Sequence, residues 1–340
     1  MAPHHAVSGE TVYKAPATIP NRTAAARRDM RVSVCHYNCG MTSSDSNWPV
    51  FSSPAWPDTY ATLHMWTQIV GKIKLKLAPS VNHWWGAALQ LCARGLTTLT
   101  MPHPAGAFEM TFDFCAHELQ IRMNDTRIKI VKLEPKSVAV FYAETMAALA
   151  DLGVAVKIWT MPVEVPNPIR FTDDTQHKSY DAAAASIWWR AMARSADVMN
   201  EFRAAFVGKS SPVHFWWGAF DLAVTRFSGR RAPERAGADA MTKEAYSHEV
   251  ISAGFWPGSG SLGEPAYYAY AAPEPEGFKT ARVRPPQAFY GDAGAGGEFF
   301  LKYDDVRKAS SPRGALMEFL QSTYEAGATL GNWNRKELER

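Results

Sequence analysis

The chain has 340 residues, of which 46% are hydrophobic and 20% are charged, a composition typical of a globular protein with a substantial core. Its formal net charge is +3, and residues 1–40 account for it with five basic against two acidic residues, so the remainder is neutral and a nucleic-acid-binding surface is not expected. No run of about 18 apolar residues and no apolar leader is present, so we expect no membrane span and a cytoplasmic location.

Residues 1–40 are rich in Ala, Pro, Arg and His and have no sustained apolar period. Segments of this kind bury too little apolar surface to offset the entropy lost on ordering. We therefore predict a disordered or loosely attached tail. The four cysteines lack the paired spacing of a zinc site, so we expect free thiols at Cys35, Cys39, Cys92 and Cys115.

Residues 41–165 are predicted to form a helix, four strands and a second helix. Apolar residues recur at helical spacing over 52–77, after the start signal Ser-Ser-Pro. A second helix is predicted over 136–153, where Gly153 ends it. Alternating apolar residues predict strands between the two helices, over 84–99, 107–114, 118–123 and 127–133.

Residues 166–340 show the same order of elements. A helix is predicted over 181–206 and a closing helix over 312–331. Stretches rich in Gly and Pro within about 255–297 are expected to be inserted loops. The predicted strands lie over 215–227, 247–256, 266–271 and 298–304.

Two stretches share the sequence Trp-Trp-Gly-Ala, at 84–87 and at 216–219, each with an Arg eight residues after the Gly. A second pair of similar segments, 141–153 and 319–331, lies in the two closing helices. Matches in the same order indicate a tandem duplication. The predicted fold is α+β, with two α-β-β-β-β-α units whose antiparallel sheets carry helices on one face.

The second half carries most of the polar residues with chemical potential. Asp221 stands where the first half has Leu89, and His214 stands where it has Asn82. A carboxylate on an apolar face requires hydrogen bonds, a cation or a metal. Further candidate acid–base groups follow in the next predicted strand, at Tyr246, His248 and Glu249.

Two kinds of site are compatible with these residue types. His214, His248 and Glu249 could together bind a divalent metal such as iron or zinc, although no recognised metal motif is present. An Asp221–histidine pair for acid–base catalysis is the other interpretation. Both histidines remain candidates for that pair.

His64 and Gln68 are four positions apart, so they share one face of the predicted first helix. His64 there is either a general base or a histidine hydrogen-bonded at a packing site. Trp216, with its neighbouring Trp and the sequence AYYAYA, either stacks on a planar ligand or fills the core.

Arg226 and Arg230 are candidates for binding a substrate carboxylate or phosphate, because guanidinium groups form paired hydrogen bonds with such anions. Arg226 has a counterpart at Arg94 in the first half. That counterpart favours a second interpretation, in which each half repeats the same salt bridge.

Three motifs carry a resemblance to a known family: DTYATLHMWTQIVGK at 58–72, SPVHFWWGAFDLAVTRFSGR at 211–230 and EAYSHEVISAGFWPG at 244–258. With them, the chain from Trp48 to the C-terminus resembles a bacterial family classified as a domain of unknown function. The resemblance implies that the candidate residues lie within family motifs, and it implies no activity.

We therefore expect a small-molecule enzyme with its site in a cleft between the two repeats. The alternative is a non-catalytic protein that binds an aromatic or carboxylate-bearing small molecule. In both cases the expected partner is a small molecule rather than a nucleic acid or a membrane. The expected site residues are His64, Gln68, His214, Trp216, Asp221, Arg226, Arg230, Tyr246, His248 and Glu249.

Overall fold

The computed structural model describes residues 48–51, 53–258, 262–292 and 296–340. The predicted tail at residues 1–40 lies outside these ranges. The helices are α1 (Trp56–Leu77), η1 (Asn82–Trp84), α2 (Val138–Asp151), α3 (Ala182–Ala204), α4 (Ala240–Ala245), η2 (Phe278–Thr280), α5 (Tyr303–Lys308), α6 (Pro312–Leu330) and α7 (Arg335–Leu338). The strands are β1 (Leu89–Cys92), β2 (Gly95–Thr97), β3 (Met101–His103), β4 (Gly106–Asp113), β5 (Glu118–Met123), β6 (Ile128–Lys132), β7 (His214–Trp216), β8 (Asp221–Arg231), β9 (His248–Trp256), β10 (Ala266–Ala272), β11 (Phe289–Asp292) and β12 (Gly297–Lys302).

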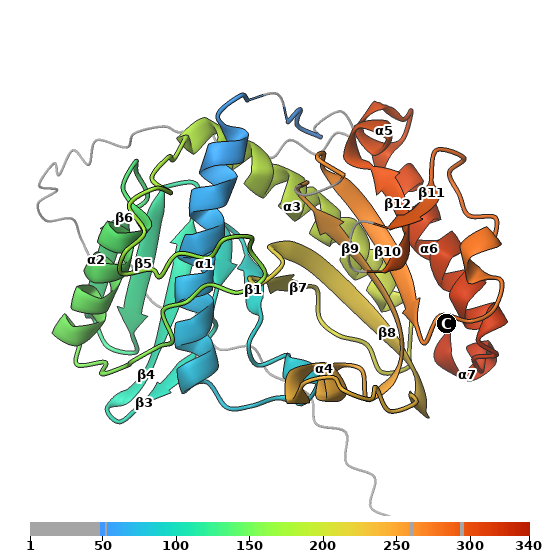
Figure 1. Cartoon of the computed structure of the whole chain (residues 1–340), viewed down its shortest axis with the longest axis horizontal. Helices are drawn as coiled ribbons and strands as arrows, with labels where there is room; N and C mark the ends of the chain where they lie inside the picture. Colours follow the sequence, from blue (N-terminus) through green and yellow to red (C-terminus); the bar gives the residue numbers. More distant parts are fainter. Residues whose placement is uncertain (1–47, 52, 259–261, 293–295) are drawn as a thin grey trace, which may run out of the picture. The chain divides into compact units, whose positions relative to one another are not determined.

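Within the described residues, the twelve strands form one antiparallel sheet, with β3 paired to β4 beside the order β11-β12-β10-β9-β8-β7-β1-β2-β4-β5-β6. The α+β class and the antiparallel pairing are thus confirmed. Strands of the two predicted repeats lie on opposite sides of the β1·β7 pair (Figure 1). The register of that pair matches Leu89 with Phe215 and Gln90 with His214.

Strand register explains which face of the sheet is buried, because residues opposite each other in an antiparallel ladder point to the same face. Leu89 and Leu91, two positions apart in β1, share a face and continue one apolar row across the sheet. The row consists of Val131, Leu119, Phe112, Leu96, Leu91, Leu89, Phe215, Leu222, Phe255, Tyr267 and Leu301.

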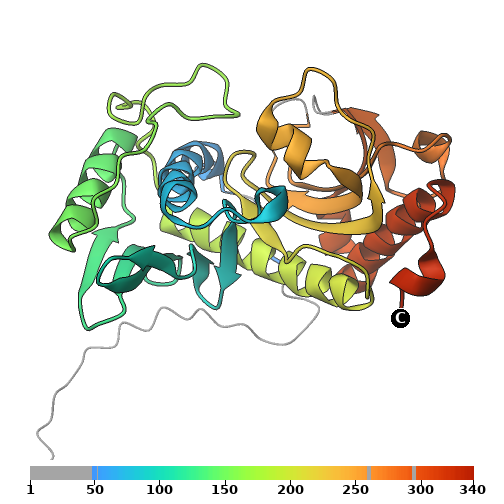
Figure 2. The same cartoon turned by 90° about the horizontal axis from the view of Figure 1, so that it is seen from below.

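The long helices pack on this apolar face. The α1 residue Trp66 stacks on Phe141 of α2, whose ring in turn lies near Phe112 of β4. In the second half, Trp188 of α3 contacts Phe215 of β7 edge to face. The sheet twists strongly, so in Figure 2 α1 and α2 lie above the first-half strands whereas α3 and α6 lie below the second-half strands. The opposite face of the sheet in the second half is not covered by these long helices.

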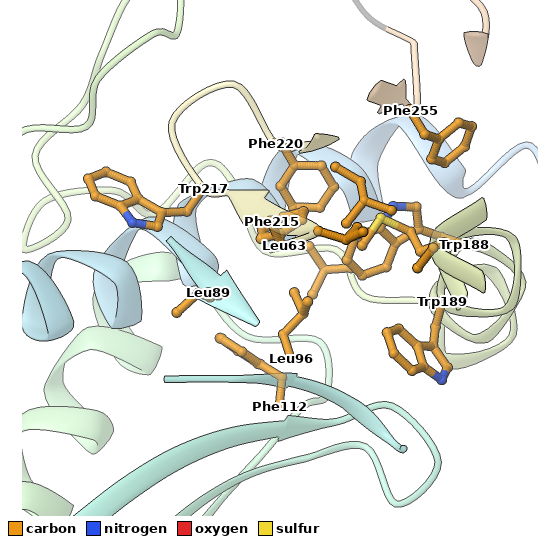
Figure 3. Close-up of a cluster of buried hydrophobic side chains, with 14 of the residues drawn as sticks. Leu63, Leu89, Leu96, Phe112, Trp188, Trp189, Phe215, Trp217, Phe220 and Phe255 are labelled. Carbon is orange, nitrogen blue, oxygen red and sulfur yellow. The ribbon is translucent and has the colours of Figure 1, made fainter. Parts of the chain in front are cut away.

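One hydrophobic core spans both halves of the sheet. Figure 3 shows Leu63 of α1 and Leu89 of β1 beside Phe215 and Phe220 of the second half. Trp188 has ring contacts with Trp56 and Phe114 of the first half and stacks on Phe220 of the second with ring centroids 4.9 Å apart. None of the helices in the described part of the chain is both long and apolar enough to cross a lipid bilayer.

Local sequence sets the starts of the long helices. The side chains of Ser137, Asp181 and Ser311 accept hydrogen bonds from backbone N–H groups in the first turns of α2, α3 and α6. Pro57 and Pro312 occupy early positions of α1 and α6, where a missing N–H does no harm. The four helices predicted from periodicity are accordingly all present, with bounds that differ by a few residues.

The first Trp-Trp-Gly-Ala segment lies in a turn, not in the strand predicted over 84–99. His83 and Trp84 have φ values of 57° and 62°, and an extended strand does not continue through such residues. The chain therefore enters the sheet only at Leu89 and forms the short hairpin β1–β2.

The second Trp-Trp-Gly-Ala segment turns the chain between β7 and β8, so the strand predicted over 215–227 is also a hairpin. Phe220, with φ of 59°, ends this turn. The indole N–H of Trp217 donates a hydrogen bond of 2.9 Å to the carbonyl of Ala87, so the two similar segments are in contact.

Because of these turns, Asp221 points to a different face of the sheet from the apolar face predicted for it. Leu89 points to the helix-covered face, as do its ladder neighbours Phe215 and Leu222. Asp221 precedes Leu222 and therefore points to the opposite face. The carboxylate thus does not replace a core leucine; it lies on the face that the long helices leave open.

Candidate functional site

A pocket of about 730 Å³ lies on the open face of the second half of the sheet. Strands β8, β9, β10 and β12 form its floor. The segments on either side of α4, the β7–β8 turn and the connector between α2 and α3 form its rim. Its charged lining residues are Glu164, Asp221, Arg235, Glu274 and Glu298, and its aromatic lining residues are Tyr246, Trp256, Tyr268, Tyr270 and Phe300.

A glycine in the floor gives Tyr268 access to Asp221. Gly254 of β9 lies opposite Tyr268 of β10, and a Cβ at Gly254 would lie only 2.3 Å from the Tyr268 ring and hydroxyl. Because that Cβ is missing, the ring extends over the strand toward β8. The Tyr268 hydroxyl donates a hydrogen bond to the Asp221 carboxylate, whose residue is only 7% exposed.

The connector brings Glu164 to the pocket. Gln68 of α1 binds both backbone groups of Val163: its amide nitrogen donates to the carbonyl at 2.8 Å, and its oxygen accepts from the N–H at 2.9 Å. Glu164 follows with a left-handed φ of 56°. Its carboxylate lies over Gly218, where a Cβ would be 2.3 Å from the Glu164 Oε1.

His64 fixes the other side of this rim. Its Nε2 is 2.7 Å from the carbonyl of Gly218, and burial lowers the pKa of His64 to about 4, so the neutral ring donates to that carbonyl. The same Nε2–H cannot accept from Gln68, whose amide nitrogen donates to Val163 instead. His64 and Gln68 therefore shape the rim of the pocket without lining it.

Burial changes the acidity of the pocket carboxyl groups. The pKa of Asp221 is raised to about 7, first by burial and then by Glu164, against the hydrogen bond from Tyr268. The pKa of Glu298 is raised to about 7, first by burial and then by Asp221 and Asp292. Burial also raises the pKa of Glu164. Within the described ranges, none of Glu164, Asp221 and Glu298 forms an ion pair.

Tyrosines form one wall of the pocket. The rings of Tyr268 and Tyr270 are stacked with centroids 6.2 Å apart and planes 13° apart, because the two residues alternate onto the same face of β10. The hydroxyl groups of Tyr270 and Tyr246 are 2.9 Å apart and hydrogen-bonded. The guanidinium of Arg235 lies 4.0 Å from the centroid of the Tyr246 ring.

The predicted residues His214 and His248 belong to a different cluster on the same open face. His214 lies against Trp85, and His248 lies against His83, with ring centroids 6.0 and 5.7 Å apart. Lys209 Nζ is 2.6 Å from Nε2 of His83 and donates to it, while Nδ1 of His83 donates to a backbone carbonyl. Burial lowers the pKa of His214 to about 4, so its ring is neutral near pH 7.

The metal set predicted from His214, His248 and Glu249 is not assembled. Glu249 forms an ion pair of 2.7 Å with Arg230, which also donates to the carbonyl of Asn332 after α6. Among the described residues, no group of three or more His, Cys, Asp or Glu side chains is placed to hold a metal ion. The alternation of side chains along β9 separates His248 from Glu249.

Arg226 and Arg230 do not form the predicted anion site. Arg226 points to the helix-covered face, where its guanidinium lies 3.4 Å from the centroid of the Phe202 ring and 4.2 Å from that of Tyr324. Arg94 does form a salt bridge, with Asp113 at 2.6 Å, whereas no carboxylate in the described part of the chain pairs with Arg226. The idea of a repeated salt bridge is therefore also wrong.

Of the ten predicted site residues, Asp221 and Tyr246 line the pocket. Trp216 packs edge to face against His214 and lies outside the lining. Sequence reasoning missed Glu164, Trp256 and Glu298, and it considered Tyr268 and Tyr270 only as part of the AYYAYA segment that either stacks on a ligand or fills the core. The alternation of Tyr268 and Tyr270 was a usable signal, whereas nothing in the Pro-flanked connector marks Glu164.

Comparisons with known proteins identify a family. The profile of a family of unknown function, DUF5996, matches residues 48–340. Neither the curated proteins nor the solved structures contain a match. The match covers all the elements that build the pocket, and the chain belongs to this family of unknown function.

Proposed function

We propose that the protein is a small-molecule enzyme whose reaction takes place in the pocket on the open face of β8, β9, β10 and β12. The observation that carries this proposal is the placement of Asp221 and Glu298 in one cavity, each with its pKa raised to about 7. A carboxyl group that titrates near neutrality can both give and take a proton at working pH.

The surrounding residues have supporting roles in this proposal. Tyr268 holds the Asp221 carboxyl group through its hydroxyl, which limits the directions in which a proton is exchanged. Glu164 adds a negative charge that raises the pKa of Asp221. His64 and Gln68 are positioning residues, because they fix the rim and do not line the cavity.

A second candidate function is binding without catalysis, which the aromatic wall favours. Stacked rings such as Tyr268 and Tyr270 offer flat apolar contact to a planar or cationic group. A carboxylate-bearing ligand is disfavoured, since Glu164, Asp221 and Glu298 would repel it. If the protein binds a ligand without catalysis, that ligand is therefore expected to be neutral or cationic.

Catalysis can be tested with a mixed metabolite extract followed by mass spectrometry. We expect the wild-type protein to consume at least one compound that an Asp221→Asn/Glu298→Gln double variant leaves unchanged. Asp151→Asn, which alters a carboxylate on the exposed end of α2, is the matched control and should behave as wild type. Retention of compounds without conversion, or no effect on any compound, would contradict the enzyme proposal.

Carboxyl titration gives an independent test. In protein labelled with ¹³C at Asp and Glu side chains, two carboxyl resonances should titrate near pH 7, and each should vanish in the matching Asp221→Asn or Glu298→Gln variant. Carboxyl groups that all titrate below about pH 5 would remove the physical basis of the proposal.

We also propose that the chain arose by tandem duplication. The order α1-β1-β2-β4-β5-β6-α2 in the first half parallels α3-β7-β8-β9-β10-β12-α6 in the second, with β1 and β7 adjacent at the centre. The two Trp-Trp-Gly-Ala segments lie at different points of this order, before β1 in the first half and between β7 and β8 in the second, so the order of the elements carries this proposal. Failure of residues 56–151 and 182–330 to superpose would contradict the duplication.

A cytoplasmic location and a small-molecule partner, rather than a nucleic acid, remain proposals. The charge of the chain supports a small-molecule partner rather than a nucleic acid, because residues 41–340 carry no net charge. A gel-shift assay with duplex DNA and with RNA should show no binding at physiological salt.

A further inference from the structure

We propose that the molecule held in this pocket is a small organic cation, whose ammonium group lies against the tyrosine faces and pairs with Asp221 and Glu298. This inference names the substrate class for the site of the proposed function and rests on that site. Three features of the pocket support it: its size, its aromatic wall and its charge.

The cavity suits a small molecule. A volume of about 730 Å³ falls in the usual range for such sites. Two glycines make room for residues that line it: Gly254 for the Tyr268 ring, and Gly218 for the Glu164 carboxylate. A side chain at either position would shift the neighbour that lines the cavity.

The aromatic wall is suited to a positive charge. The faces of Tyr and Trp rings carry negative potential and attract ammonium and guanidinium groups. The wall already holds such a group, because the Arg235 guanidinium lies 4.0 Å from the centroid of the Tyr246 ring. Tyr268, Tyr270 and Trp256 line the same cavity as the carboxyl groups.

The charges in the cavity favour a cation over an anion. Four carboxylate residues line it, and among the described lining residues Arg235 is the sole cation. Asp221 and Glu298 lie in the floor without a cationic partner in the described residues. A bound ammonium group would supply the missing counter-charge, and a bound carboxylate would add to the repulsion.

Binding of a cation should be coupled to release of protons. In the free protein near pH 7, Asp221 and Glu298 are partly protonated because of their burial. An entering ammonium group favours the ionised carboxylate, so the carboxyl proton passes to solvent and the ion pair remains. No bond in the ligand is changed in this step.

Calorimetry of the full chain with choline tests the inference, with dimethylbutanol as the neutral probe in which carbon replaces the cationic nitrogen. We expect choline to bind at least about tenfold more tightly than dimethylbutanol. The heat of binding should differ between phosphate and HEPES buffers near pH 7, because released protons are taken up by buffers of different ionisation enthalpy.

Variants connect the binding to the two carboxyl groups. Glu298→Gln, at a partly exposed position, and Asp221→Asn should each weaken choline binding by about tenfold or more, while Asp151→Asn should not. Circular dichroism checks that each variant is folded, and Glu298→Gln decides the outcome if Asp221→Asn is not. Equal affinity for choline and dimethylbutanol, no choline binding, unchanged affinity in the folded variants, or equal heats in both buffers would overturn the inference.

These outcomes are separable from those of the proposed function. Failure of choline to bind, with carboxyl groups that titrate near pH 7 and conversion that depends on them, would reject the cation and leave the enzyme. Choline binding without any metabolite conversion would reject the enzyme and leave a cation-binding site.

Discussion

At the scale of single residues, Asp221 shows how a β-sheet accommodates a buried carboxyl group. Its neighbour Leu222 points into the core, so Asp221 necessarily points to the open face. There it accepts a hydrogen bond from Tyr268, whose ring occupies the space above Gly254. The acid, the phenol and the missing Cβ therefore form one unit, and a change at any of them should affect the others.

Gly254→Ala tests this unit. The new Cβ would meet the Tyr268 ring and the Leu222 carbonyl oxygen at 2.3 to 2.4 Å, so the ring must move away from Asp221. We expect a loss of about 1–3 kcal/mol in the free energy of unfolding, measured by urea denaturation. The matched control is Gly291→Ala in β11, where a Cβ would have only ordinary contacts of 3.5 Å or more. Equal stability of the two variants would show that Gly254 has no such role.

Tyr268→Phe tests the hydrogen bond alone. The hydroxyl stabilises the ionised form of Asp221, so its removal should raise the pKa of Asp221 above its value of about 7. The ¹³C titration of the Asp221 carboxyl group measures this shift. Tyr270→Phe is the control, because the Tyr270 hydroxyl bonds Tyr246 rather than Asp221. A pKa of Asp221 that falls or stays constant in Tyr268→Phe would contradict the assignment.

Sequence reasoning found part of this site for a physical reason. Asp221 was detectable because it interrupts an apolar strand, and Tyr246 because it lies in the polar stretch at the start of the next predicted strand. Glu164 and Glu298 come from other parts of the chain and reach the pocket only through the order of the strands and the path of the connector. His214 and His248 did look chemically active, but tertiary packing places them beside Trp85 and His83.

At the scale of elements, α1 holds the connector in place. Gln68 binds both backbone groups of Val163 in the manner of a neighbouring strand, and this fixes the following residue, Glu164, at the rim. His64, one turn earlier, holds the β7–β8 turn through the Gly218 carbonyl. A first-half helix thus shapes a pocket whose floor belongs to the second half.

Gln68→Leu should release the connector. The change leaves the N–H and carbonyl of Val163 without their partners, which should lower the free energy of unfolding by roughly 1–3 kcal/mol. Choline binding should also weaken, since Glu164 is no longer held at the rim. The control is Thr62→Val, which removes a hydrogen bond within α1 and none to the connector. If calorimetry gives wild-type affinity for Gln68→Leu, the positioning role is wrong.

The helices and most strands could be predicted from the sequence because their apolar residues follow the period of the element. The Trp-Trp-Gly-Ala segments could not, because their pattern is that of a strand while His83, Trp84 and Phe220 adopt positive φ. Tertiary contacts such as the hydrogen bond from Trp217 to Ala87 stabilise these turns, and no local pattern records them.

At the scale of the whole molecule, buried histidines and buried carboxyl groups give opposing pH dependences. Burial lowers the pKa of His64 and His214 from 6.5 to about 4. Between these values the unfolded chain binds more protons, so their contribution to stability is lost as the pH falls. In the folded protein, Asp221 and Glu298 stay protonated up to about pH 7, whereas in the unfolded chain they lose their protons near pH 4. Their contribution to stability is therefore lost as the pH rises.

The Asp221→Asn/Glu298→Gln double variant should reveal how the buried histidines contribute to the pH dependence of stability. With the carboxyl groups gone, the free energy of unfolding should rise more steeply between about pH 4 and pH 6.5 than in the wild type. Each removed group changes the slope by up to about 1.4 kcal/mol per pH unit. Urea denaturation at several pH values measures it, and parallel curves for the two proteins would contradict the expected cancellation.

The pairing of β1 with β7 also determines how the two halves of this protein behave when they are expressed as separate fragments. Two residue pairs close the sheet at its centre, and each half covers the strand edge of the other. A fragment cut within the connector would present a bare edge strand, which is prone to self-association. Each fragment expressed alone should therefore aggregate, whereas co-expression of both should restore a complex that elutes at the size of the intact chain.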